Sequence, residues 1–403
     1  MKYCIAMRAR LIIPFAVSVL LLAACKNDYQ YKPPVVDRPE QELTVDGTFP
    51  IISWTGANRA DAARKIPTLK GCGINTHLEW YDTIDDVMAV LDICQENGVK
   101  LITRSSTFLS NISSEVPRMK GHPALYGYHI MDEPETTDFP MLADAVKSIQ
   151  AIDPKHPCYI NVYPNWAWGG GKYYYAKINS FLQEVPVTFL SFDYYPIMEV
   201  DGKRELRPEW YYNLEDVRKA SRLHKIPFWA FALSLSHTIP GTFYPVPTIS
   251  DLRLQQFANL VYGAQAFQYF TYWGIYQGAA TPVYERVKTI NEELQSLAFI
   301  FLDADVKNVW HTGHIIPAGT KELTVMPYGV ESLSAGDAGL IVSQVEKEGK
   351  TYIALVNKDL ENNQAVSIRF RGSVIRYDHD GYKITSTEEF SLLPADITVF
   401  ELK

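Results

Sequence analysis

Short apolar runs recur along the middle of the chain, and longer segments with a helical period separate them. Between residues 83 and 98, for example, apolar side chains return every three or four positions and a glycine closes the segment, which predicts an amphipathic helix. Further helices are expected over 139–152, 214–223, 252–263 and 283–301. Strands are expected over 50–54, 74–80, 100–104, 125–131, 158–163, 188–194, 228–233 and 266–272.

This alternation yields eight strand-plus-helix units within residues 49–302. Eight such units in roughly 250 residues are typical of a (β/α)8 or TIM barrel, an α/β fold whose active sites lie at the C-terminal ends of the strands. A doubly wound open sheet is the alternative, but no glycine-rich phosphate loop follows the first strand. We therefore expect a barrel, with its chemistry at the strand ends.

A different pattern begins after residue 302, where short strands alternate with polar turns and no long helix is expected. The strands are expected over 339–345, 351–357, 365–370, 374–377, 382–385 and 397–402. The first two, and the fourth and fifth, flank polar turns as the arms of hairpins do. The pattern predicts a small antiparallel β-sandwich over residues 303–403, which we interpret as a packing module rather than a carbohydrate-binding one.

The N-terminus has the pattern of an export signal. A positively charged start precedes an apolar run over 11–22, which is too short for a comfortable membrane span. The tetrapeptide that follows, Leu22 to Cys25, resembles a bacterial lipobox, whose cysteine is lipidated after cleavage. The resemblance implies a signal peptide over 1–24, a lipid anchor at Cys25 and a polar tether over 25–48. It implies an outer-membrane lipoprotein on the periplasmic side or the cell surface; a simple signal sequence is the alternative.

Composition narrows the class of protein further. Hydrophobic residues at 47% and charged residues at 21% exclude a disordered chain and a multi-span membrane protein. The net charge of −8 argues against nucleic acid as a partner. After Cys25 only Cys72, Cys94 and Cys158 remain, which suits packed thiols better than a disulfide framework. No zinc motif or serine-hydrolase elbow occurs, so we expect no metal and no cofactor. We also expect the protein to be a monomer.

The segment from His122 to Glu135 is the most informative one for chemistry. It places Asp132 and Glu133 at the end of the fourth expected strand, and Pro134 follows them and ends the strand. Two adjacent acids are costly to keep at a barrel mouth unless they have a use. The segment resembles the fourth-strand signature of clan A glycoside hydrolases, an Asn-Glu-Pro or Asp-Glu-Pro triplet. The resemblance implies that Glu133 is the general acid/base, with Asp132 raising its pKa; helix capping and a salt bridge are the alternative.

The chain departs from that clan at strand seven, where a nucleophilic glutamate is needed. Residues 228–237 contain no carboxylate. Asp193, at the end of strand six, is the best replacement and Glu79, at the end of strand two, the next. An aspartate on another strand leaves room for a water, which fits inversion. The run around Asp193, with Trp273, also resembles family 18 chitinases, in which the substrate's acetamido group assists, but their full Asp-x-x-Asp-x-Asp-x-Glu pattern is missing.

Aromatic residues gather at the same expected strand ends. Their faces suit the C–H face of a sugar ring, and their polar edges suit its hydroxyls. The candidate sugar-binding residues are Trp54, Trp80, Tyr163, Trp166, Trp168, Tyr194, Tyr195, Tyr272 and Trp273, together with Glu79. The sequence therefore predicts a glycoside hydrolase that cleaves oligo- or polysaccharide. A non-catalytic carbohydrate-binding lipoprotein with the same cleft is the alternative, and the sugar, its linkage and the stereochemistry stay open.

Overall fold

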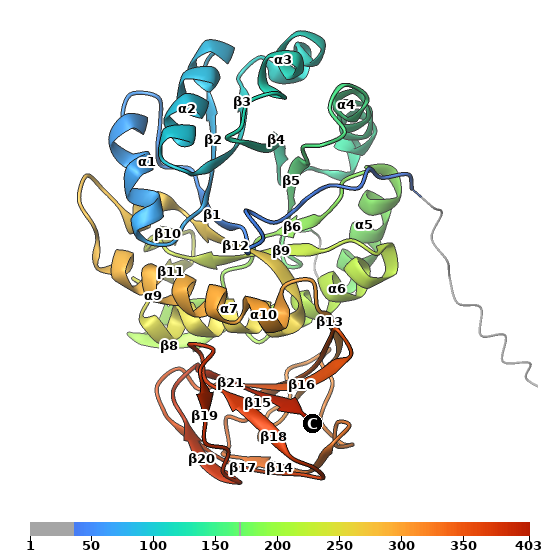
Figure 1. The fold of residues 1–403 in the computed structure, drawn as a ribbon, viewed down its shortest axis with the longest axis vertical. Coiled ribbons are helices and arrows are strands. Elements are labelled where there is room, and N and C mark those ends of the chain that lie inside the picture. Colours follow the sequence, from blue (N-terminus) through green and yellow to red (C-terminus); the bar gives the residue numbers. More distant parts are fainter. Residues whose placement is uncertain (1–35, 169–170) are drawn as a thin grey trace, which may run out of the picture. The chain divides into compact units, whose positions relative to one another are not determined.

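The computed structural model describes residues 36–168 and 171–403, and its central feature is a closed barrel of eight parallel strands (Figure 1). Around the barrel the strand order is β1-β12-β9-β6-β5-β4-β3-β2. The strands are β1 Ile51–Trp54, β2 Thr76–Tyr81, β3 Lys100–Ser105, β4 Leu125–Asp132, β5 Cys158–Val162, β6 Leu190–Phe192, β9 Phe228–Leu233 and β12 Ala264–Phe270. The predicted (β/α)8 barrel is confirmed.

Helices follow the barrel strands and lie outside them (Figure 1). The long ones are α1 Ala62–Gly71, α2 Ile84–Glu96, α3 Ile112–Met119, α4 Phe139–Ile152, α5 Gly171–Glu184, α6 Glu209–His224, α7 Ile249–Tyr262 and α9 Pro282–Ser296. The short ones are η1 Phe108–Ser110, η2 Thr136–Asp138, α8 Tyr272–Ile275 and α10 Ala298–Phe301. Side-chain caps fix several starts; Thr83, for example, accepts a hydrogen bond from the backbone of Asp86.

The last barrel strand begins and ends two residues earlier than its expected range of 266–272. The hydroxyl of Thr271 accepts a hydrogen bond from the backbone nitrogen of Trp273 and caps α8. A capping residue ends the extended backbone and begins a helix, so the strand stops at Phe270. Tyr272 was expected in the strand and Trp273 at its end, and both lie instead in the first turn of α8.

Inside the barrel, alternate residues of the strands form an apolar core. Residues 36–48, expected as part of the tether, lie against this barrel. Val45 belongs to the inner core, Tyr126 donates a hydrogen bond to the Leu43 carbonyl at 2.7 Å, and Arg38 Nε donates to the Val187 carbonyl at 2.7 Å. The expected signal peptide, Cys25 and residues 25–35 of the expected tether lie outside the described residues.

Two insertions after barrel strands β6 and β9 join into a small sheet that the sequence pattern did not reveal. The strands β7 Ile197–Val200 and β8 Lys203–Leu206 follow β6, and β10 His237–Ile239 and β11 Thr242–Tyr244 follow β9. They form an antiparallel sheet in the order β10-β11-β7-β8. Because both insertions leave C-terminal ends of barrel strands, this sheet stands beside the mouth of the barrel.

The C-terminal residues form two antiparallel sheets, as expected for a sandwich. The strands are β13 Asp305–His311, β14 Val330–Ala335, β15 Leu340–Lys347, β16 Lys350–Asn357, β17 Gln364–Phe370, β18 Val374–Tyr377, β19 Lys383–Ile384, β20 Glu389–Leu392 and β21 Ile397–Leu402. The six-stranded sheet has the order β13-β15-β16-β21-β18-β19 and the three-stranded sheet the order β14-β17-β20. One apolar core takes side chains from both sheets.

Hydrogen bonds fasten this sandwich to the barrel. Ser343 of β15 donates to the Val261 carbonyl of α7 at 2.8 Å, and Arg218 of α6 donates to the Val306 carbonyl at 2.8 Å. Elsewhere, Cys72, Cys94 and Cys158 are buried free thiols, as predicted. Within residues 36–168 and 171–403, the helices are all too short or too polar to cross a membrane.

Candidate active site

A pocket of about 180 Å³ opens among the C-terminal ends of the barrel strands. It is lined by Trp54, Asp132, Glu133, Asn161, Asp193, Tyr195, Phe231 and Phe270. The polar side chains come from the ends of β4, β5 and β6, which are neighbours in the barrel, and three aromatic ones from β1, β9 and β12, which are also neighbours. The pocket therefore has a carboxylate wall facing an aromatic wall.

Glu133 follows the last residue of β4 in an unusual backbone conformation. Its φ is 48°, in the left-handed region that a residue with a side chain adopts at a cost of about 1 kcal/mol or more. The backbone nitrogen of Glu133 donates to the Asn161 carbonyl at 2.8 Å, which holds this conformation. Such strain is typically kept where it directs a side chain, and here that side chain lines the pocket.

Burial raises the pKa of Glu133 to about 8, and the negative charges of Asp193 and Asp132 add to this effect. An ordinary glutamate has a pKa near 4.5 and is ionised at neutral pH. Glu133 instead keeps its proton near neutrality. It is therefore able to donate a proton to a ligand oxygen at the pH where its neighbours are partly ionised.

Asp193 follows β6 and is the second carboxylate of this wall. Burial raises its pKa to about 7 and the charge of Asp132 adds to the rise, whereas hydrogen bonds with Asn161 and Tyr195 lower it. Asn161 Nδ2 lies 2.9 Å from Asp193 Oδ1 and 3.2 Å from Asp132 Oδ1, so one amide group serves both aspartates. The pocket thus holds a protonated and a more readily ionised carboxyl side by side.

Glu79, the other candidate for the second carboxylate, lies apart from this pocket. Glu79 follows Leu78 in β2, and Leu78 belongs to the apolar core inside the barrel. Because neighbouring side chains of a strand point to opposite sides, the Glu79 side chain points outward. Its Oε2 accepts a hydrogen bond from the Gly56 backbone at 2.9 Å, and burial raises its pKa. Glu79 therefore holds the loop after β1, and the structure does not bring it together with Glu133 and Asp193.

The expected aromatic residues divide into three groups. Trp54 and Tyr195 line the pocket, and Tyr163 lies beside the carboxylates: burial raises its pKa, and the charge of Glu133 adds to the rise. Trp80, Trp166 and Trp273 are exposed. Trp168, Tyr194 and Tyr272 are buried in the core between the barrel and its helices and do not line the pocket.

The pocket is also lined by three residues that the sequence pattern did not single out, Asn161, Phe231 and Phe270. All three lie in apolar strands, where a phenylalanine is expected in the core and a single asparagine matches no motif. The alternation of side chains along a strand could have identified two of them. Asn161 lies two positions after Tyr159, and Phe270 lies two positions after Gln268, on the inward face of the barrel.

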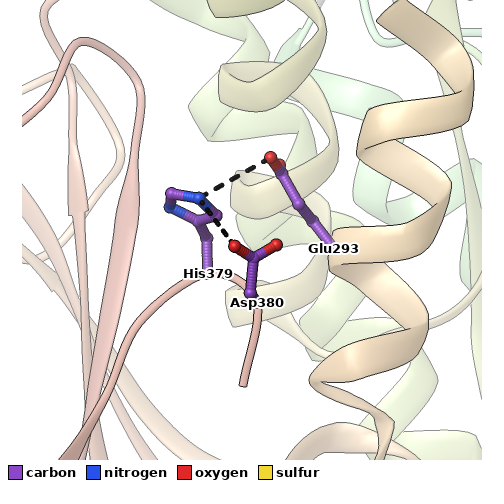
Figure 2. A group of neighbouring side chains, drawn as sticks. All are labelled: Glu293, His379 and Asp380. Carbon is purple, nitrogen blue, oxygen red and sulfur yellow. Dashed lines mark ion pairs between the residues drawn. The ribbon is translucent and has the colours of Figure 1, made fainter. Parts of the chain in front are cut away.

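One group of side chains in the described part of the chain has the spacing to hold a metal ion, namely Glu293, His379 and Asp380 (Figure 2). Arg253 already pairs with both oxygens of Glu293, and His379 Nδ1 lies 2.8 Å from Asp396 Oδ1. The group joins helix α9 to the turn before β19, far along the chain from the pocket residues. We therefore interpret it as an ion-pair network between barrel and sandwich.

No protein-family profile matches the chain, and no curated protein matches its sequence. Solved structures match its fold. A candidate α-galactosidase from Bacteroides fragilis NCTC 9343 matches with a TM-score of 0.51 at 10% identity, over 89% of this chain and 79% of that chain. A candidate α-galactosidase/melibiase from the same organism gives 0.50 at 10% identity, over 89% and 79%.

A MutB variant in complex with its substrate sucrose gives a TM-score of 0.51 at 8% identity, over 89% of this chain and 99% of that chain. At such low identities these matches show the fold alone. The chain has a (β/α)8 barrel with a C-terminal β-domain, an architecture also found in structures of glycoside hydrolases.

Proposed function

We propose that this protein is a glycoside hydrolase in which Glu133 is the general acid and Asp193 the second catalytic carboxylate. The observation that carries the proposal is the pairing of two carboxyls of raised pKa opposite an aromatic wall in one pocket. A sugar ring has the matching two-sided chemistry, because its C–H face packs on aromatic rings and its hydroxyls bind carboxylates and amides.

The reaction follows from these positions. Glu133 donates its proton to the glycosidic oxygen as the bond from that oxygen to the anomeric carbon breaks. Asp193 accepts a proton from a water whose oxygen bonds to the anomeric carbon. β5 separates β4 from β6, so the two carboxyls reach the pocket from strands that are not neighbours. We infer that they leave room for a water between them, as in inverting enzymes. Nuclear magnetic resonance of the first-formed product anomer tests inversion.

The first experiment is a screen of the purified protein against a panel of oligo- and polysaccharides, with the products separated by size. Hydrolysis of at least one glycan supports the enzyme. A non-catalytic carbohydrate-binding protein is the second candidate, because β9, the seventh barrel strand, carries no carboxylate. Tight binding of a glycan without any product in this screen would favour that candidate.

We expect a bell-shaped dependence of kcat/KM on pH. Asp193 is active when ionised, so the rate should rise as the pH passes its pKa of about 7. Glu133 is active when protonated, so the rate should fall as the pH passes its pKa of about 8. Initial rates in buffers of constant ionic strength check this, and a maximum at pH 5 would contradict the assignment of both roles.

Trp80 is expected to hold a second sugar outside the pocket. The pocket of about 180 Å³ is smaller than those that take drug-sized ligands, so it suits one sugar ring. Trp80 is 41% exposed, meets Trp54 edge to face at 6.4 Å, and stacks one face on His129 at 5.3 Å. The opposite face of the Trp80 indole is therefore free to pack against the next ring of a longer ligand.

Replacing Trp80 with alanine should lower kcat/KM on a di- or trisaccharide about 3- to 10-fold, the value of one aromatic contact. Hydrolysis of the glycosyl fluoride of the same sugar should stay unchanged, because fluoride does not reach Trp80. Tyr328→Ala, which removes an aromatic side chain 75% exposed in the C-terminal domain, is the matched control. Equal losses on both substrates would count against a second sugar at Trp80.

We also propose that the protein is an outer-membrane lipoprotein anchored through Cys25, on the strength of the lipobox-like sequence. Cys25→Ala should move the protein from the membrane to the soluble fraction and remove the lipid mass from its N-terminal peptide. Fractionation and mass spectrometry measure the two effects. Unchanged partition, with no added mass in the wild type, would disprove the anchor.

A further inference from the structure

A chain of buried hydrogen bonds inside the barrel leads to the carboxylates of the pocket. The Tyr159 hydroxyl donates to Gln268 Oε1 at 2.7 Å, and Gln268 Nε2 donates to Ser191 Oγ at 2.9 Å. Ser191 Oγ donates to Asn161 Oδ1 at 2.9 Å. The four side chains are at most 2% exposed and come from β5, β6 and β12. Water therefore does not compete for these bonds.

The direction of the chain follows from the number of hydrogens available. A serine hydroxyl has one hydrogen, and that of Ser191 goes to the carbonyl oxygen of Asn161. The NH2 group of Asn161 must then point away from Ser191, toward Asp193 and Asp132. Its two hydrogens match these two acceptors. The buried network thus ends in a pair of donors aimed at two of the three carboxyls of the pocket.

Glu133 is placed differently. No group in the described residues donates a hydrogen bond to its carboxyl oxygens. Burial and the charges of Asp193 and Asp132 are therefore the causes that raise its pKa. A donor that binds the ionised form of a carboxyl favours that form, whereas a carboxyl without one keeps its proton to higher pH. The amide of Asn161 therefore distinguishes the two aspartates from the glutamate.

We propose that Asn161, oriented by Ser191, Gln268 and Tyr159, is a positioning residue that decides which carboxyl of the pocket carries the proton. It holds Asp193 and Asp132 as hydrogen-bond acceptors, and leaves Glu133 as the proton donor. The inference rests on the proposed function for its catalytic meaning, but the distribution of protons is a property of the protein itself. It is therefore measurable without a substrate.

The test is an infrared titration of the full-length protein labelled with carbon-13 in either aspartate or glutamate. In the wild type the last pocket carboxyl to lose its proton should be a glutamate, and its band should vanish in Glu133→Gln. In Asn161→Leu the pKa of Asp193 should rise by about 1 unit or more. The last band should then belong to an aspartate and vanish in Asn161→Leu combined with Asp193→Asn.

Ser191→Ala provides a second route, because it keeps Asn161 but removes the donor that orients its amide. We expect a shift in the same direction, and recovery in Ser191→Thr, which restores the hydroxyl. Thr103→Val is the control: Thr103 is a fully buried hydroxyl in β3 that has no hydrogen-bond partner in the described residues. Circular dichroism confirms that each variant is folded.

An unchanged order of titration in folded Asn161→Leu and Ser191→Ala would overturn the inference, whether or not the protein hydrolyses a glycan. A changed order in a protein that hydrolyses nothing would uphold the inference and remove the proposed function. If the protein is active, the acidic limb of its pH profile should move up by about 1 unit in both variants. kcat should then fall about 5-fold at pH 7, because a smaller fraction of Asp193 is ionised there, with the control unaffected.

Discussion

Replacing Glu133 by glutamine should abolish hydrolysis of natural glycosides while leaving glycan binding nearly intact. Glutamine keeps the shape of the side chain but carries no proton that it can give to a leaving oxygen. Loss of a general acid lowers kcat by about 10²- to 10⁴-fold. Because burial and two acidic neighbours raise the pKa of Glu133 to about 8, the wild-type residue is protonated at neutral pH and the full effect should appear there.

The substrate series makes this test specific for proton donation. A glycosyl fluoride needs little help for its leaving group, so Glu133→Gln should retain most of the activity on it. Glu96→Gln, which changes an exposed glutamate of helix α2, is the matched control and should behave as the wild type. Full activity of Glu133→Gln on a natural glycoside would end the hydrolase assignment in its present form.

The barrel could be predicted because its signal is periodic and repeated. The ranges expected for β4, β9 and α4 agree with the structure to within one residue at each end. The insertions after β6 and β9 were missed because strands of three or four residues are too short to show a period. These strands are held by pairing between distant segments, which a local pattern does not record.

The place of a candidate residue in the pocket was predictable where a motif or a strand end marked it, as for Glu133 and Asp193. It was not where the decisive fact was the direction of a side chain. Neighbouring side chains of a strand point to opposite sides, so the Leu78 side chain points into the barrel and the Glu79 side chain points out of it. Likewise Tyr195 lines the pocket while Tyr194 is buried against the helices. Asn161 had no motif at all, and only its hydrogen bonds reveal its place.

Replacing Asp193 by asparagine should lower kcat about 10²- to 10⁴-fold if Asp193 activates the water. A second effect should accompany it, because the charge of Asp193 contributes to the raised pKa of Glu133. Without that charge the pKa of Glu133 falls, and the basic limb of the pH profile should move to lower pH. The shift of this limb measures the charge that Asp193 places beside Glu133, and the loss of kcat at the new optimum measures its role in activating the water.

Glu79→Gln is the comparison that separates Asp193 from its rival. Glu79 lies outside the pocket and accepts a hydrogen bond from the Gly56 backbone, so its variant should lose stability before it loses chemistry. Thermal unfolding and kcat measured on both variants test this difference. A larger loss of kcat in Glu79→Gln than in Asp193→Asn, at equal stability, would transfer the catalytic role to Glu79.

Retained activity in both variants, confined to substrates with an acetamido group, would instead indicate that the substrate supplies the second group.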